Sequence, residues 1–309
     1  MLVNLKHKIA KHLSSPRRLI SEFNLYIDEK LQKDIPDIDC VRNEISPIFV
    51  IGVNRSGTSI MSYLLSQHPD VEGLYNGNDS PLYYKSGHSN AYCESMHIWE
   101  HLMPTLLKGY ATCWGLPEQI SRTYRNRAKN KAEKRRLAYD LLRYRMTDKT
   151  SLLKNNLNTL RIGLIADVFP KARFIYICRG VEDFMSSSID KWRNDESGTL
   201  LQTPAAGLHW HLINLVARYD LETYARGRYE IVWLEKLNES EKTARELFSS
   251  INSFLSLKTF DFDFSEVESH WGENKVLKNN IETPSFPEIT KIVEFELKLL
   301  KHHSFISNK

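Results

Sequence analysis

The sequence has little cysteine and no long hydrophobic run. Its 309 residues include four cysteines, which form no CxxC pair and have no nearby histidine at zinc-binding spacing. This scarcity argues against a zinc module and a disulfide framework, so we expect free thiols in a reducing compartment. No apolar stretch is long enough to span a bilayer, and the N-terminus lacks the apolar core of a signal peptide. We therefore expect a cytoplasmic protein without a transmembrane segment.

Charge of one sign is not in large excess either. The formal net charge is +4 at pH 7, so the composition predicts no nucleic-acid partner. Residues 1–27 are basic and amphipathic, which permits peripheral contact with a membrane surface. Packing of this stretch on the protein's own body is the interpretation that we favour.

Four short apolar runs are present, separated by long helical patterns. The runs occupy residues 48–51, 151–153, 173–178 and 229–234. Helical patterns follow the first and third runs, at residues 57–67 and 183–193. Buried strands that alternate with helices are typical of an α/β fold, here a three-layer sandwich with a central parallel sheet flanked by helices.

The chain is long enough for one large domain with additions at both ends. We expect an N-terminal helical extension at residues 1–45 and the α/β domain at residues 46–270. A mainly helical insertion is predicted around residues 75–150. Residues 271–309 are expected to form a C-terminal tail and helix that pack on the core.

A basic segment at residues 122–145 is predicted to be one long helix. Its apolar positions form an approximate stripe, and its polar positions are dominated by Lys and Arg. Two interpretations remain open: a solvated face, or a positive surface that concentrates an anionic substrate.

The stretch Gly-Val-Asn-Arg-Ser-Gly-Thr-Ser, residues 52–59, has the layout of a phosphate-binding loop. It follows an apolar strand and precedes an apolar helix, whose N-terminus and backbone N–H groups can bind an anion. Gly52 and Gly57 allow a tight turn, and Arg55 adds a cation. A purely structural turn is the alternative. The loop also carries three hydroxyl groups, on Ser56, Thr58 and Ser59.

This loop lacks the lysine that nucleoside-triphosphate loops place before their final Ser or Thr. That lysine contacts the β- and γ-phosphates, and an acidic residue helps to hold magnesium. The nearest acidic candidate, Asp167, falls inside a helical pattern. A phosphate compound without a γ-phosphate, bound without a metal, fits the loop better.

A second cluster follows the apolar run at residues 173–178. Arg179 directly follows that run, and Ser187 lies in the helix predicted after it. Because ligands bind beyond the carboxyl ends of parallel strands, Arg179 and the loop at residues 52–59 are expected to converge on one nucleotide. The alternative for Arg179 is a surface ion pair with Glu182 or Asp183.

With both motifs in view, the sequence resembles the sulfotransferases that use 3′-phosphoadenosine 5′-phosphosulfate (PAPS). "NRSGTS" resembles their 5′-phosphosulfate loop, and "FIYICRGVEDFMSSS" resembles their 3′-phosphate motif. The pattern Arg-x-x-x-Asp-x-x-x-Ser falls on Arg179, Asp183 and Ser187. The resemblance covers roughly residues 47–257, with a loose match over residues 74–151.

The resemblance implies a P-loop-like nucleotide site that holds PAPS, releases adenosine 3′,5′-bisphosphate (PAP) and needs no metal. Arg55 would hold the 5′-phosphosulfate, together with Ser56, Gly57, Thr58 and Ser59. Arg179 and Ser187 would hold the 3′-phosphate. Lys154, at the end of the second predicted strand, resembles the lysine that several members direct at the leaving oxygen. The implied catalytic cations are therefore Arg55 and Lys154.

The general base is less clear. In cytosolic small-molecule members a histidine follows the lysine by two residues, but that position here is Asn156, which cannot act as a base. The candidates are Asp79, which we favour, Glu72 and His88. A turn-forming role for Asp79 is the alternative.

The implied activity is sulfuryl transfer to a hydroxyl of a saccharide, a lipid or a small metabolite, which can itself be anionic. Two other functions remain open. One is a kinase with a degenerate P-loop, and the other is a non-catalytic protein that binds a nucleotide or a polyanion. The oligomeric state is not predicted.

Overall fold

The computed structural model describes residues 38–73, 124–142, 147–184, 187 and 203–268. Its centre is a five-stranded sheet in the order β2-β3-β1-β4-β5, and every neighbouring pair is parallel. The strands are β1 (Ile48–Gly52), β2 (Val71–Gly73), β3 (Thr150–Lys154), β4 (Arg173–Cys178) and β5 (Tyr229–Trp233).

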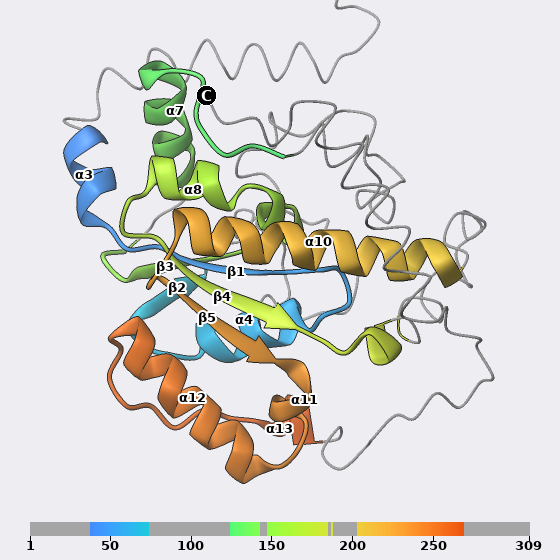
Figure 1. Cartoon of the computed structure of the whole chain (residues 1–309). Helices are drawn as coiled ribbons and strands as arrows, with labels where there is room; N and C mark the ends of the chain where they lie inside the picture. Colours follow the sequence, from blue (N-terminus) through green and yellow to red (C-terminus); the bar gives the residue numbers. More distant parts are fainter. Residues whose placement is uncertain (1–37, 74–123, 143–146, 185–186, 188–202, 269–309) are drawn as a thin grey trace, which may run out of the picture.

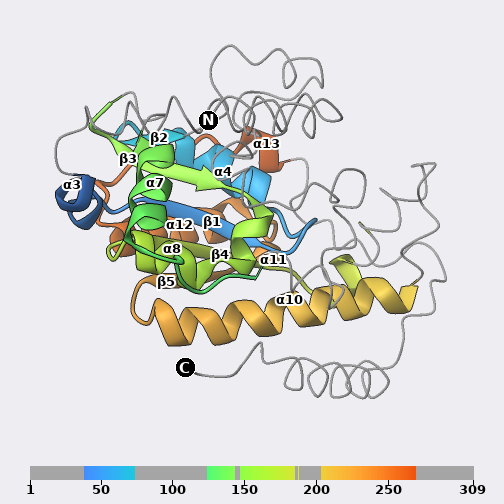
Figure 2. The ribbon, with the colours of Figure 1, turned by 90° about the horizontal axis from the view of Figure 1, so that it is seen from above.

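Helices cover both faces of this sheet (Figures 1 and 2). One face carries α3 (Ile38–Glu44), α7 (Lys131–Leu142), α8 (Ile162–Val168) and α10 (Thr203–Tyr224). The other carries α4 (Thr58–Ser66), α11 (Leu234–Leu237), α12 (Glu241–Leu255) and α13 (Ser265–Glu268). The predicted three-layer α/β sandwich with a parallel sheet is therefore confirmed.

The strand β1 shows why this arrangement forms. Successive side chains of a strand point to opposite faces of the sheet, and all five residues of β1 are buried. Phe49 and Ile51 enter the core under α8 and α10, whereas Ile48 and Val50 enter the core under α4 and α12. A strand that is apolar at every position needs a layer of helices on each side.

Four of the five strands were predicted from their apolar runs. The strand β2 was missed because it is only three residues long and contains Glu72 and Gly73, which give no strand pattern. The predicted fourth strand ends one residue early, since Leu234 begins α11. Most of the predicted N-terminal extension, insertion and C-terminal tail lies outside the described residues, so those boundaries stay predictions.

The prediction of one long basic helix is wrong over residues 124–130, which are not helical. The helix α7 begins only at Lys131. The reason is a cap: Asn130 Oδ1 accepts from the Glu133 backbone N–H at 2.9 Å, and Glu133 Oε2 accepts from the Lys129 N–H at 2.5 Å. This reciprocal pattern satisfies N–H groups at the start of a helix.

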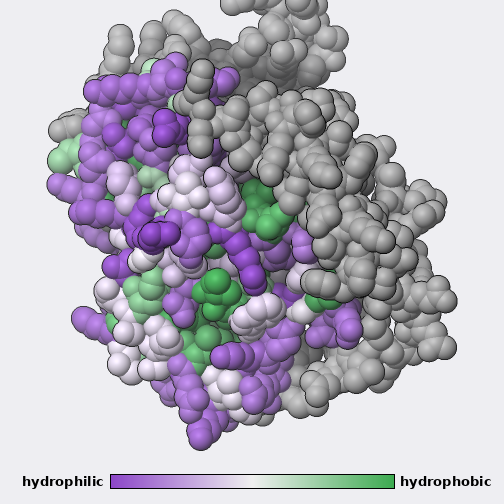
Figure 3. All heavy atoms as spheres, in the orientation of Figure 1, coloured by the Kyte–Doolittle hydropathy of each residue, from purple (hydrophilic) through white to green (hydrophobic). Residues whose placement is uncertain are grey.

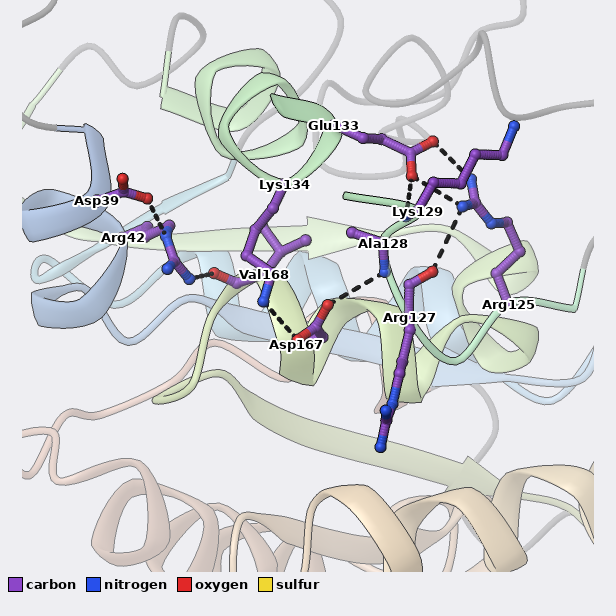
Figure 4. Close-up of polar contacts among 10 residues, drawn as sticks. All are labelled: Asp39, Arg42, Arg125, Arg127, Ala128, Lys129, Glu133, Lys134, Asp167 and Val168. Carbon is purple, nitrogen blue, oxygen red and sulfur yellow. Dashed lines mark hydrogen bonds and ion pairs between the residues drawn. The ribbon is translucent and has the colours of Figure 1, made fainter. Parts of the chain in front are cut away.

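Several cations of the basic segment are paired with carboxylates (Figure 4). Arg125 donates to both oxygens of Glu133, at 3.0 and 2.9 Å. Lys134 Nζ lies 2.6 Å from Asp167 Oδ1 in α8, where the sequence predicted a helix interior. The surface over α3 and α7 is mostly hydrophilic (Figure 3). The Lys134–Asp167 pair attaches α7 to α8, and the Arg125–Glu133 pair attaches α7 to the segment before it. Both pairs favour a structural role for these cations.

A buried carboxyl group on α10 predicts a pH dependence of stability. Asp220 is 0% exposed, and its Oδ1 accepts from the Tyr124 hydroxyl at 2.9 Å. Burial raises the pKa of Asp220 to about 7. Between about pH 4 and pH 7 the folded protein therefore keeps a proton that the unfolded chain loses, and the free energy of unfolding falls as pH rises.

We expect Asp220→Asn to remove this part of the pH dependence. Relative to the wild type, the variant gains about 3 kcal/mol of stability between pH 5 and pH 8, because about two pH units of this window lie below the pKa of Asp220 and each corresponds to about 1.4 kcal/mol. Urea unfolding at both pH values measures the difference. An equal effect of the substitution at pH 5 and pH 8 would show that Asp220 does not titrate in this range.

None of the helices in the described part of the chain combines the length and the apolar character that a membrane crossing needs.

Candidate phosphate-binding site

The loop between β1 and α4 has a backbone that only glycine allows at two positions. A Cβ on Gly52 (φ 155°) would lie 2.6 Å from the Ile177 carbonyl oxygen of β4, and a Cβ on Gly57 (φ 94°) would lie 2.5 Å from Leu234. Arg55 also has a left-handed backbone, with φ 66°, which is unfavourable for a side chain with a Cβ. The loop is thus a tight turn pressed against β4 and α11.

At the helix end of this loop the structure provides an anion-binding surface. Gly57 is the N-cap of α4, no side chain caps the helix, and its first turn contains no acidic residue. The N–H groups of a first helical turn have no partner within the helix and carry the positive end of its dipole. This end of α4 therefore favours a negatively charged group.

The four loop residues predicted to bind phosphate together with Arg55 differ in their surroundings. Ser56 is buried, and both its N–H and its Oγ–H donate to the Val53 carbonyl, at 3.2 and 2.7 Å. In this structure the Ser56 side chain therefore shapes the loop. Thr58 is also buried, whereas Gly57 and Ser59 are half-buried.

The second predicted motif lies beside this loop, because β4 pairs with β1 and Ile177 is in register with Gly52. Arg179 donates from Nη1 to the Arg55 carbonyl at 2.9 Å. Arg55 donates from Nε to the Ser187 hydroxyl at 3.1 Å. The structure thus brings Arg55 together with Arg179 and Ser187, which follow it in the sequence by more than 120 positions.

The environment of Arg179 keeps its backbone in place. The Trp210 indole N–H of α10 donates to the Arg179 carbonyl at 2.9 Å, and the Gly180 N–H donates to Glu235 Oε1 at 2.6 Å. Burial lowers the pKa of Arg179, and the charges of Asp183 and Glu235 oppose this shift. A guanidinium stays protonated through such a change.

The alternative ion pair of Arg179 with Glu182 or Asp183 is not formed. Among the described residues no carboxylate lies within ion-pair distance of Arg179, and its guanidinium donates to the Arg55 carbonyl instead. Arg179 is therefore directed at the loop.

Lys154 ends β3, as the sequence predicted. Its Cα is in register with Val50, two residues before the loop, and it is 3% exposed. The structure thus places Lys154 on the strand next to β1, at the same edge of the sheet as the loop.

Of the three candidates for the general base, only Glu72 lies among the described residues. Asp79 and His88 lie outside the described residues. Glu72 lies on β2 in register with Ser151, three residues before Lys154. Its Oε2 accepts from the Thr147 N–H and hydroxyl, at 3.2 and 3.0 Å. The structure does not bring Glu72 to the loop.

Residues 155–160 form contacts that the sequence analysis missed. The short helix η5 (Asn156–Leu160) is capped by Asn155 and lies against the loop. Thr159 Oγ1 accepts from the Gly52 N–H at 2.9 Å and donates to the Gly52 carbonyl at 3.1 Å. The only sequence signal was a polar run, Asn-Asn-Leu-Asn-Thr, directly after an apolar strand.

The fold and this loop define a class of protein, the parallel α/β proteins with a P-loop-like anion site after the first strand of the sheet. The chain belongs to the sulfotransferase family, whose sequence profile matches residues 47–251. The match covers both phosphate motifs and Lys154. A search of curated protein sequences gave no significant match.

Several solved sulfotransferase structures are similar in fold. Sulfotransferase STF9 from Mycobacterium avium is 15% identical, with 91% of this chain and 81% of that chain covered and a TM-score of 0.50. Sulfotransferase STF1 from Mycobacterium tuberculosis H37Rv is 16% identical, with 78% of each chain covered and a TM-score of 0.46. A sulfotransferase from Alicyclobacillus acidocaldarius is 13% identical, with 84% and 94% covered and a TM-score of 0.47.

Proposed function

We propose that the protein transfers the sulfuryl group of PAPS to a hydroxyl of a saccharide, a lipid or a small metabolite. Membership of the family supports sulfuryl transfer in general. The observation that carries PAPS as the donor is the contact between the two motifs: Arg55 donates to Ser187, and Arg179 donates to Arg55. A nucleotide with phosphates at both the 5′ and the 3′ positions needs two adjoining anion sites.

The residues present fit such a donor. The N-terminus of α4 and the Arg55 guanidinium suit the 5′-phosphosulfate, and Arg179 and Ser187 suit the 3′-phosphate. Gly52 and Gly57 allow the loop to pack closely on β4 and α11, since a Cβ at either position would clash with Ile177 or Leu234. No lysine follows Gly57, which agrees with a donor that has no γ-phosphate.

PAPS supplies a sulfuryl group on a phosphate that leaves with negative charge when the acceptor oxygen attacks sulfur. We assign Arg55 and Lys154 to the stabilisation of that charge, which builds up in the transition state. Asp79 is assigned as the base that accepts the proton of the acceptor hydroxyl. The remaining loop residues bind and orient the donor, so that attack and departure are in line.

Ligand-dependent thermal stability tests this proposal. PAP at 100 times its dissociation constant is expected to stabilise the protein by about 2.7 kcal/mol. ATP with magnesium is expected to have little effect. Stabilisation by ATP–magnesium but not by PAP would contradict the proposal and favour a kinase. Stabilisation by PAP without transfer to any acceptor tested would favour a non-catalytic binding protein.

Replacement of the proposed base separates binding from chemistry. We expect Asp79→Asn to leave PAP affinity unchanged and to lower transfer from radiolabelled PAPS at least 100-fold, since a positioned base contributes about 10²–10⁴ in rate. Asp70→Asn, an exposed aspartate just before β2, is the matched control and is expected to transfer normally. Unchanged turnover by Asp79→Asn would remove Asp79 as the base.

A further inference from the structure

Asn156 joins two points of the phosphate loop that lie on either side of Arg55. Its Nδ2 donates to Asn54 Oδ1 at 2.5 Å, and its Oδ1 accepts from the Thr58 hydroxyl at 2.9 Å. Asn54 precedes Arg55, and Thr58 is the first residue of α4. A single amide therefore holds both sides of the turn that carries Arg55.

In the hydrogen bond between Thr58 and Asn156, Thr58 is the donor. The same proton would be needed to bind an anion, so the two interactions compete. A threonine hydroxyl has one proton to donate, and in this structure the proton points to Asn156. If Thr58 is to donate to a 5′-phosphate, its hydroxyl must turn away from Asn156. Because Thr58 is 3% exposed and its contact with Asn156 is partly buried, water replaces the hydrogen bond lost by Asn156 Oδ1 only in part, and this loss opposes anion binding.

The chemistry of the amide resolves this conflict. An asparagine side chain has a donor at one end and an acceptor at the other, so a half-turn of the Asn156 amide exchanges the two. Its Nδ2 then donates to Thr58 Oγ1, and its Oδ1 accepts from the Asn54 amide, which can turn with it. Both hydrogen bonds of Asn156 are kept, with their directions reversed, and the Thr58 proton is released toward the anion.

We propose that Asn156 is a positioning residue that works as a reversible hydrogen-bond relay between Asn54 and Thr58. In the free protein it holds the phosphate loop in shape, and in the nucleotide complex it gives up the Thr58 proton to the 5′-phosphate. The proposal rests on the proposed function, because it takes PAP and PAPS as the anions that reach Thr58. It assigns a role to the position where a base had been sought.

The variant Asn156→Asp tests the reversal of these hydrogen bonds. A carboxylate only accepts hydrogen bonds at neutral pH, so Asn156→Asp keeps the Thr58 proton and cannot reverse. We expect it to weaken PAP binding about 100-fold in calorimetric titration. Asn156→Ala removes both hydrogen bonds of this side chain to the loop but leaves the Thr58 proton free. We expect this variant to bind PAP about tenfold more weakly than the wild type.

The matched control is Asn155→Asp, which adds the same charge one residue away. The Asn155 side chain caps η5 by accepting from the Leu157 N–H at 2.9 Å, and aspartate serves equally well in such a cap. We expect this variant to bind PAP within about fivefold of the wild type. Equal weakening by Asn155→Asp and Asn156→Asp would show an effect of charge alone and overturn the relay.

A second measurement does not depend on the folding of any variant. In NMR spectra of the wild type, the side-chain amide signals of Asn156, assigned through bonds, are expected to shift when PAP is added. Unchanged signals at saturating PAP would also overturn the relay, while leaving the proposed function intact. A wild-type protein that does not bind PAP would overturn both.

Discussion

Replacing Arg179 with alanine is expected to weaken the binding of PAP about 100-fold. Arg179 directs its guanidinium at the phosphate loop, where it donates to the Arg55 carbonyl. We assign its remaining donors to the 3′-phosphate. A hydrogen bond to a charged group contributes about 1.5–3 kcal/mol, and a loss of about 2.7 kcal/mol corresponds to 100-fold in affinity. Isothermal titration calorimetry with PAP measures the change.

Arg226→Ala is the control for this variant. Arg226 also lies at a surface of the protein, but its side chain is 83% exposed and contacts Glu222 at 3.4 Å. We expect it to bind PAP as the wild type does. Arg179→Lys should recover only part of the affinity, because an ammonium lacks the planar fork of the guanidinium. An Arg179→Ala protein that binds PAP within threefold of the wild type would remove Arg179 from the site.

Replacing Lys154 with methionine is expected to lower kcat about 10²–10³-fold. Methionine keeps the length of the side chain but not its charge, so the variant removes one group assigned to the leaving phosphate oxygen. Loss of one preorganised donor of this kind costs about 2.7–4 kcal/mol in the barrier. Because the charge develops mainly in the transition state, PAP affinity should fall much less than kcat.

Transfer from radiolabelled PAPS at saturating donor measures this effect. Lys171→Met, at an exposed position in the turn before β4, is the control and should retain the wild-type kcat. If Lys154→Met kept at least half of the wild-type kcat, the charge of Lys154 would have no part in the transfer step.

The two predicted phosphate motifs could be found in the sequence because each is a short stretch with a characteristic residue pattern. Gly52 and Gly57 stand where a tight turn needs them, and apolar runs before the loop and before Arg179 mark buried parallel strands. Since parallel strands present their carboxyl ends at one edge, the convergence of the motifs followed from their positions alone. The contacts of Arg55 with Arg179 and Ser187 agree with that reasoning.

The features that were missed depend on contacts between distant residues, on one local cap or on a very short strand. Two residues of η5 contact the phosphate loop: Thr159 binds Gly52, and Asn156 binds Thr58. The partners are about 100 positions apart, and no periodicity in the sequence indicates such pairs. The long basic helix was predicted from composition, but the cap at Asn130 starts α7 later than the charge pattern suggests. The strand β2 is too short for its pattern to be recognised.

The central claim is that the site recognises a nucleotide with phosphates at both the 5′ and the 3′ positions. Calorimetric titration of the wild type with PAP and with adenosine 5′-monophosphate tests it most directly, because the two ligands differ only in the 3′-phosphate. We expect PAP to bind about 100-fold more tightly than adenosine 5′-monophosphate, and we expect this preference to disappear in Arg179→Ala. Equal affinity of the wild-type protein for the two nucleotides would contradict this claim.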